Sequence, residues 1–221
     1  MKVIQYSDFQ IQARSTELGN RYDESKDRLN KILLEIDKHQ PDLIVIPGDV
    51  FEFYHANGDE QKIFAEHLRK ISDHHKVIII PGNHDIKQRD NAIIANQEVS
   101  NATDAIEPIV IALNSPNVRY YKETGIYTWL GFDWCVWSQY SKFNATKANK
   151  PYSPWGLGVE PENPFIELYH DPIAGCIGWS GEPETRYDKS GTFAKFKANT
   201  IIAGDIHSPY IYDIGEGRKF I

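Results

Sequence analysis

The chain has 221 residues, a formal net charge of −7 and a sequence pI near 5.6. This length allows one α/β domain with one sizeable core, and the acidic balance argues against binding a polyanion through surface charge alone. No apolar run is long enough to cross a membrane, and Cys135 and Cys176 fit no metal-binding spacing. We therefore expect a cytoplasmic protein with free thiols and no membrane partner.

The first half of the chain alternates β-rich runs with helical patterns. The β-rich runs are residues 2–6, 43–46 and 77–80, and apolar residues recur on one helical face within 24–39 and 58–72. Pro41 ends the first of these helices. This order predicts parallel strands joined by right-handed helical crossovers, and residues 91–113 are expected to hold a further helix and strand.

Alternating, aromatic-rich runs replace this pattern from residue 118 onward. Antiparallel strands are expected at 120–121, 125–130 and 132–138, further strands at 165–169 and 200–203, and a hairpin at 209–221. The whole pattern predicts an α/β fold in which two mixed β-sheets form a sandwich flanked by helices.

Side chains suited to metal binding follow five of these strands. The motifs are Ser7-Asp8-Phe9-Gln10, Gly48-Asp49, Gly82-Asn83-His84-Asp85, His170 and Gly204-Asp205-Ile206-His207. Ligands bind at the carboxyl ends of strands in α/β sheets, and this residue set suits a pair of divalent cations that share a carboxylate. A single Asp or His after a strand is usually a turn residue or an ordinary hydrogen-bonding group. The joint pattern predicts a two-metal hydrolase.

Residues 139–164 are basic and aromatic in an otherwise acidic chain. No acidic residue lies between Trp134 and Val159, and the lysines alternate with aromatic residues; these lysines are Lys142, Lys147 and Lys150. We favour a long surface loop whose aromatic side chains pack on a sheet, with contact to a nucleic acid as the alternative. Lys87 and Arg89 are solvated charges by default, but their place beyond the Asn83-His84 motif would also suit phosphate contacts.

The five motifs, in this order and spacing, resemble the calcineurin-like metallophosphoesterase superfamily over essentially the whole chain. The superfamily pattern is Asp-x-His, Gly-Asp, Gly-Asn-His-(Asp/Glu), His and Gly-His-x-His. The steps of 41 residues from Asp8 to Asp49 and 34 residues on to Asn83 are most similar to the SbcD-type nuclease subunit of the double-strand-break repair complex. Gln10 and Asp205 stand where the family has histidines, and that combination resembles phage nucleases of this type.

This resemblance implies a ligand set for each of two ions. One ion would be held by Asp8, Gln10, Asp49 and His207, and the other by Asp49, Asn83, His170 and Asp205. Manganese is the expected ion, with magnesium as the alternative. His84 would face the scissile phosphate as general acid or charge stabiliser, and Glu52 would orient His84.

The resemblance further implies a manganese-dependent DNA nuclease, exonuclease or endonuclease, that acts in DNA repair and recombination. An SbcC-type ABC ATPase is the expected partner and a homodimer is left open; a phage protein would act in the host cytoplasm. Relatives continue into a capping region, so we expect residues 1–221 to be one catalytic domain truncated before it. The alternatives are another phosphoesterase, acting on phosphoproteins or small phosphodiesters, and a metal-binding subunit with weak catalysis, which Gln10 and Asp205 suggest.

Overall fold

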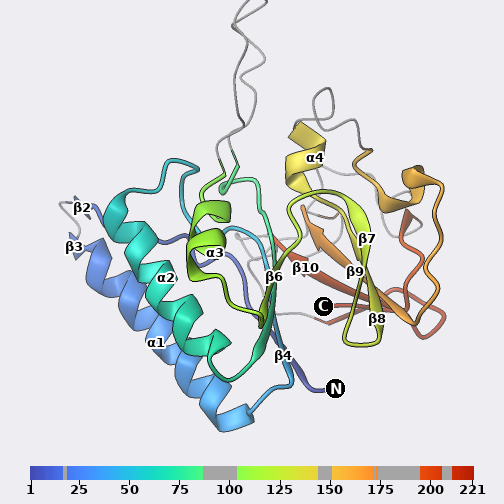
Figure 1. Ribbon diagram of the computed structural model, residues 1–221, viewed down its shortest axis with the longest axis horizontal. Helices are drawn as coiled ribbons and strands as arrows, with labels where there is room; N and C mark the ends of the chain where they lie inside the picture. Colours follow the sequence, from blue (N-terminus) through green and yellow to red (C-terminus); the bar gives the residue numbers. More distant parts are fainter. Residues whose placement is uncertain (17–18, 87–103, 144–150, 172, 174–194, 206–210) are drawn as a thin grey trace, which may run out of the picture. The chain divides into compact units, whose positions relative to one another are not determined.

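The computed structural model describes residues 1–16, 19–86, 104–143, 151–171, 173, 195–205 and 211–221 (Figure 1). Its contacts divide the chain into two compact units, Met1–Tyr120 and Tyr121–Ile221. The single domain expected from the sequence stays a prediction. The expected α/β fold class is confirmed, because each unit contains a sheet and helices.

The first unit contains a four-stranded parallel sheet in the order β1-β4-β5-β6. Its strands are β1 (Val3–Gln5), β4 (Leu43–Pro47), β5 (Lys76–Ile80) and β6 (Val118–Tyr120), with a separate ribbon of β2 (Ser15–Thr16) and β3 (Gly19–Asn20). Its helices are α1 (Arg21–His39), α2 (Gly58–Ser72) and α3 (Glu107–Leu113). The predicted alternation of parallel strands and crossover helices is confirmed. The antiparallel prediction at residue 120 is wrong, because β6 runs parallel to β5.

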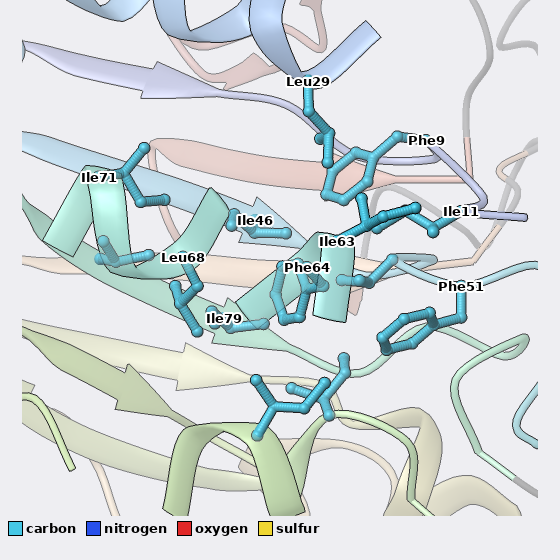
Figure 2. Close-up of a cluster of buried hydrophobic side chains, with 14 of the residues drawn as sticks. Phe9, Ile11, Leu29, Ile46, Phe51, Ile63, Phe64, Leu68, Ile71 and Ile79 are labelled. Atoms are coloured by element: carbon cyan, nitrogen blue, oxygen red, sulfur yellow. The ribbon is translucent and has the colours of Figure 1, made fainter. Parts of the chain in front are cut away.

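All three helices pack on one face of this sheet, where they form a continuous apolar core (Figure 2). Alternate residues of the inner strands point into it, including Ile46 from β4 and Ile79 from β5. Helix α2 contributes Phe64, Leu68 and Ile71, which share one helical face at steps of four and three residues. This packing holds the strands side by side, so that the loops following β1, β4 and β5 leave the same edge of the sheet.

Helix α2 covers the predicted residues 58–72, because its start is strongly specified. The Asn57 side chain accepts hydrogen bonds from the main chain of Asp59 and Glu60, and Glu60 Oε2 accepts the Asn57 N–H at 2.8 Å. Helix α1 begins three residues before the predicted 24–39 and ends where Gln40 turns left-handed (φ 45°) ahead of Pro41.

The second unit contains a six-stranded mixed sheet in the order β11-β12-β10-β9-β8-β7. Its strands are β7 (Gly125–Trp129), β8 (Phe132–Val136), β9 (Phe165–His170), β10 (Thr200–Gly204), β11 (Tyr212–Asp213) and β12 (Lys219–Phe220). The predicted antiparallel pairing of β7 with β8 and the C-terminal hairpin of β11 and β12 are confirmed. Strand β9 lies parallel to both β8 and β10.

The basic aromatic segment 139–164 is more regular than the expected loop. It contains helix α4 (Gln139–Phe143) and the short 3-10 helix η1 (Pro154–Leu157). Tyr152 and Trp155 pack against the buried aromatic cluster of the second unit, and the Tyr152 ring meets Trp137 edge-on at 5.6 Å. Packing of the aromatic side chains, the interpretation favoured from the sequence, is therefore confirmed for these two residues.

Two composition-based expectations concern thiols and membranes. Cys135 is a buried free thiol in β8, whereas Cys176 lies outside the described residues. Within the part of the chain that the structure describes, no helix has the length and apolarity that a membrane crossing requires.

Candidate metal centre

The loops that follow β1 and β4 run alongside each other and are tied by main-chain hydrogen bonds. The N–H groups of Asp8, Gln10 and Ile11 donate to Gly48, Asp49 and Val50 respectively, at 3.3, 3.2 and 2.8 Å. Ile11 and Phe51 then form a parallel bridge. The pairing of β1 with β4 thus extends beyond both strands, and it fixes Asp8 and Gln10 relative to Asp49.

Several predicted ligands have a backbone conformation that residues other than glycine rarely adopt. The φ angles are positive at Asp8 (56°), Gln10 (43°), Asp49 (53°) and, in the second unit, Asp205 (67°). A non-glycine residue in the left-handed region costs about 1–2 kcal/mol. Such strain persists where the surrounding structure enforces it, and it clusters at functional sites.

Gly82 is required by its close approach to Asp49. A Cβ added at Gly82 would lie 2.1 Å from Asp49 Oδ1 and 2.3 Å from the Asp49 main-chain nitrogen. Any larger residue would displace the aspartate, so the glycine of the Gly82-Asn83-His84 motif leaves the space that Asp49 occupies.

Asp85 joins the loops that follow β4 and β5. Its carboxylate is fully buried and accepts hydrogen bonds from the N–H groups of Phe51 and Gly82, both at 2.9 Å. The sequence motif contained Asp85, but no role followed from the pattern. A buried carboxylate that binds the main chain of two loops acts as a structural clamp.

His84 is held through both its main chain and its side chain. Its N–H donates to Asp49 Oδ1 at 3.0 Å, and its ring nitrogen Nδ1 lies 2.7 Å from the carbonyl oxygen of Glu52. Glu52 therefore contacts the ring through its main chain, and the orienting role expected of its carboxylate stays a prediction. Burial alone would lower the pKa of His84, but the Asp49 carboxylate and the hydrogen bond to Glu52 outweigh it and raise the pKa.

In each unit two predicted ligands lie close together. Asp8 and Asp49 of the first unit offer carboxylate oxygens within 4.8 Å of each other, and His170 and Asp205 of the second offer ligand atoms within the same distance. His170 is the fully buried last residue of β9, and Gln139 at the start of α4 donates its amide to the His170 carbonyl. These donors fit a divalent cation, because oxygen and imidazole nitrogen are the ligands such ions take.

The structure describes only some of the other predicted site residues. Asn83 is half-buried beside His84, whereas His207, Lys87, Arg89, Lys147 and Lys150 lie outside the described residues. Lys142 pairs with Asp171 and lies 5.2 Å from the centre of the Tyr152 ring. The structural roles of Gly82, Asp85 and Gln139 were not predicted from the sequence. Gly82 and Asp85 belong to the Gly82-Asn83-His84-Asp85 motif, which marked them as candidates, whereas no sequence pattern pointed to Gln139.

The chain belongs to the calcineurin-like phosphoesterase family, whose family model matches residues 1–209. Members of this family are hydrolases that bind divalent metals. The resemblance seen in the motifs is therefore confirmed, and with it the fold class.

Individual relatives are more distant. The chain is 26% identical over 203 residues to the uncharacterized protein R555 of Acanthamoeba polyphaga mimivirus. The matched region covers 89% of this chain and 14% of that protein. It is 29% identical over 129 residues to the DNA double-strand break repair protein Mre11 of Nanoarchaeum equitans. This second matched region covers 53% of this chain and 33% of that protein. Among solved structures, it is similar to the Pseudomonas putida nuclease MPE, with 16% identity, a TM-score of 0.37 and coverage of 75% of this chain and 59% of that one.

Proposed function

We propose that this chain is a metal-dependent nuclease that hydrolyses phosphodiester bonds in DNA. The observation that carries the proposal is the pair of loops bearing Asp8 and Asp49, which are joined by main-chain hydrogen bonds, have positive φ angles at both aspartates and lie beside His84. The chain's first 209 residues also match a phosphoesterase family. The Nanoarchaeum equitans relative is named as a DNA double-strand break repair protein, which supports DNA as the substrate.

Two divalent cations, manganese in preference to magnesium, are part of the proposal. The first would be held by Asp8, Gln10, Asp49 and His207, and the second by Asp49, Asn83, His170 and Asp205. This set is rich in oxygen donors, which favours manganese or magnesium over zinc. Bound divalent cations supply a water nucleophile near neutral pH and stabilise negative charge at the phosphate.

His84 is assigned the transfer of a proton to the leaving oxygen. The Glu52 carbonyl can only accept a hydrogen bond, so Nδ1 of His84 carries a proton and Nε2 is the atom that gains and loses one. Nε2 lies 4.0 Å from Asp49 Oδ2, and this carboxylate stabilises the charged imidazole. The Glu52 carboxylate is retained as a second, weaker electrostatic partner.

Hydrolysis of linear duplex and single-stranded DNA, with manganese or with EDTA, tests the function. His84→Ala should lower the rate by about 10²- to 10⁴-fold, as expected for loss of a general acid, while manganese binding stays close to wild type. His74→Ala is the matched control, since His74 is exposed and outside the motifs. Cleavage of a small phosphodiester but not of DNA would favour the other phosphoesterases, and a wild-type rate in His84→Ala would remove the assigned role.

A role in repair and recombination with an SbcC-type ATPase is also proposed. The name of the Nanoarchaeum equitans relative supports the repair role, and the motif resemblance alone supports recombination and the ATPase partner. A complex of defined stoichiometry in analytical ultracentrifugation, with and without such an ATPase, would test the partner. The same measurement on the chain alone decides whether it forms a homodimer.

A further inference from the structure

An exposed aromatic stack lies on the loop between β4 and α2. Phe53 is 43% exposed and stacks on His55, with ring centres 5.4 Å apart and planes inclined by 23°. The Arg14 guanidinium lies 5.7 Å from the centre of the Phe53 ring, and Tyr54 meets His55 edge-on at 5.0 Å. We call Arg14, Phe53 and His55 the Phe53 stack.

The position of the stack is set by the same main-chain ties that fix the proposed metal ligands. Phe51 is anchored in the core (Figure 2). The Glu52 carbonyl, one residue before Phe53, accepts the hydrogen bond from His84. The Glu52 N–H donates a hydrogen bond to the carbonyl oxygen of Ile11 at 3.4 Å, and Ile11 lies three residues before Arg14 in the chain. The Phe53 stack is therefore held at a defined place beside His84 and Asp49 within the first unit.

Core packing does not explain this arrangement. Among the residues whose side-chain burial the structure describes, Phe53 is the only Phe, Tyr or Trp that is exposed. In the second unit, by contrast, Trp137, Tyr169, Phe196 and Phe220 pack into a buried cluster. An exposed phenyl ring with a guanidinium beside it combines an aromatic surface open to solvent with a positive charge for a phosphate. Sequence-tolerant binding of single-stranded nucleic acid combines these two features.

We propose that the Phe53 stack binds an unpaired nucleobase next to the scissile phosphate. This inference rests on the proposed function and narrows its substrate class to nucleic acid with a single-stranded or frayed end, because a base inside a duplex has no free face to offer. Arg14 contacts a neighbouring phosphate of the same strand.

A binding measurement tests the stack without turnover. A short single strand with 2-aminopurine at its end, in calcium, should lose fluorescence on binding the wild-type chain. Phe53→Leu should abolish the quenching and weaken binding by about 5- to 150-fold, whereas Phe53→Trp should retain both. Ile111→Ala is the matched control, because Ile111 is 70% exposed on α3. Unchanged quenching and affinity in Phe53→Leu would overturn the proposal.

A second measurement separates this inference from the proposed function. With manganese, the wild-type chain should cleave an oligonucleotide with a normal end faster than one with an abasic end. Phe53→Leu should lose this preference, because its rate should fall more on the normal end than on the abasic end. An equal loss on both strands would show a merely structural role and overturn the proposal. If the wild-type chain cleaves neither strand, the proposed function fails, and the 2-aminopurine measurement still decides whether the stack binds a base.

Discussion

Gly82 lies so close to Asp49 that a substitution at Gly82 should disturb a proposed metal ligand. Gly82→Ala places a Cβ 2.1 Å from Asp49 Oδ1, so the free energy of unfolding should fall by about 1–3 kcal/mol and manganese affinity should fall with it. Gly58→Ala is the control, because a Cβ there meets nothing within 4 Å, and it should change stability by less than about 1 kcal/mol. Urea denaturation and manganese titration measure both effects. A Gly82→Ala protein as stable as wild type, with wild-type manganese affinity, would show that the loop yields freely.

Gln10 and Asp205 make the two proposed ion sites unequal. Asp205 adds a negative charge to one site, and Gln10 offers a neutral amide oxygen to the other, so the Asp205 site should fill first. Gln10→His should raise zinc affinity at the weaker site by roughly tenfold, because imidazole is the better ligand for zinc. Titration calorimetry, with Gln12→His as the control, measures the change. Two equally tight sites that Gln10→His leaves unaltered would refute the assignment.

Asp133 connects strand β8 to the segment that precedes β9. Its buried carboxylate accepts hydrogen bonds from the main chain of Glu162 and Asn163 and from the Thr128 hydroxyl, at 2.8, 2.9 and 2.6 Å. Burial alone would raise the pKa of Asp133, but these hydrogen bonds outweigh it and lower the pKa from 3.8 to about 2. The charged carboxylate therefore stabilises the folded second unit.

Acid unfolding should reveal this contribution. Because the folded-state pKa is lowered, the stabilisation is complete above the ordinary value of 3.8 and is lost as the pH falls towards 2. Asp133→Asn should lose about 2 kcal/mol at neutral pH, and its difference from wild type should shrink below pH 4. Thermal unfolding between pH 2 and pH 7 measures this, with the exposed Asp37→Asn as control. A difference that does not vary with pH would contradict the assigned charge.

For the whole molecule, charge determines how DNA can bind. Two dications would take the formal net charge from −7 to −3, so DNA affinity should depend strongly on divalent metal. We further predict that neutralising the basic segment lowers the salt dependence of DNA binding, by about 0.7–0.9 in slope per lysine that contacts a phosphate. Lys142 should contribute least, because it already pairs with Asp171.

Glutamine substitutions in the basic segment test this prediction. The test variant changes Lys142, Lys147 and Lys150. The control removes the same charge from α1 by changing Lys26, Lys31 and Lys38. Binding of labelled DNA over a range of salt concentrations gives the slope for each variant. An equal slope in both would leave the basic segment with only its packing role.

Much of the fold could be predicted because it follows from local patterns. Helix α2 was predicted to the residue, since Asn57 and Glu60 specify its start through neighbours in sequence. The direction of β6 was predicted wrongly, because the direction of a strand depends on how the intervening chain returns it to the sheet. Helix α4 was missed, since five residues are too few to show a helical period.

The sequence by itself determined the family, the five motifs and their places at strand ends, because ligand type and the distance along the chain from strand to motif are local properties. Only the tertiary structure decided that Asp49 requires Gly82 as its neighbour, that the Glu52 carbonyl meets His84, and that Phe53 stays exposed. These features depend on loops 30 or more residues apart, brought together when β1, β4 and β5 pair in one sheet. Pairing of distant strands is set by the burial of a whole sheet face, which no short stretch of sequence expresses.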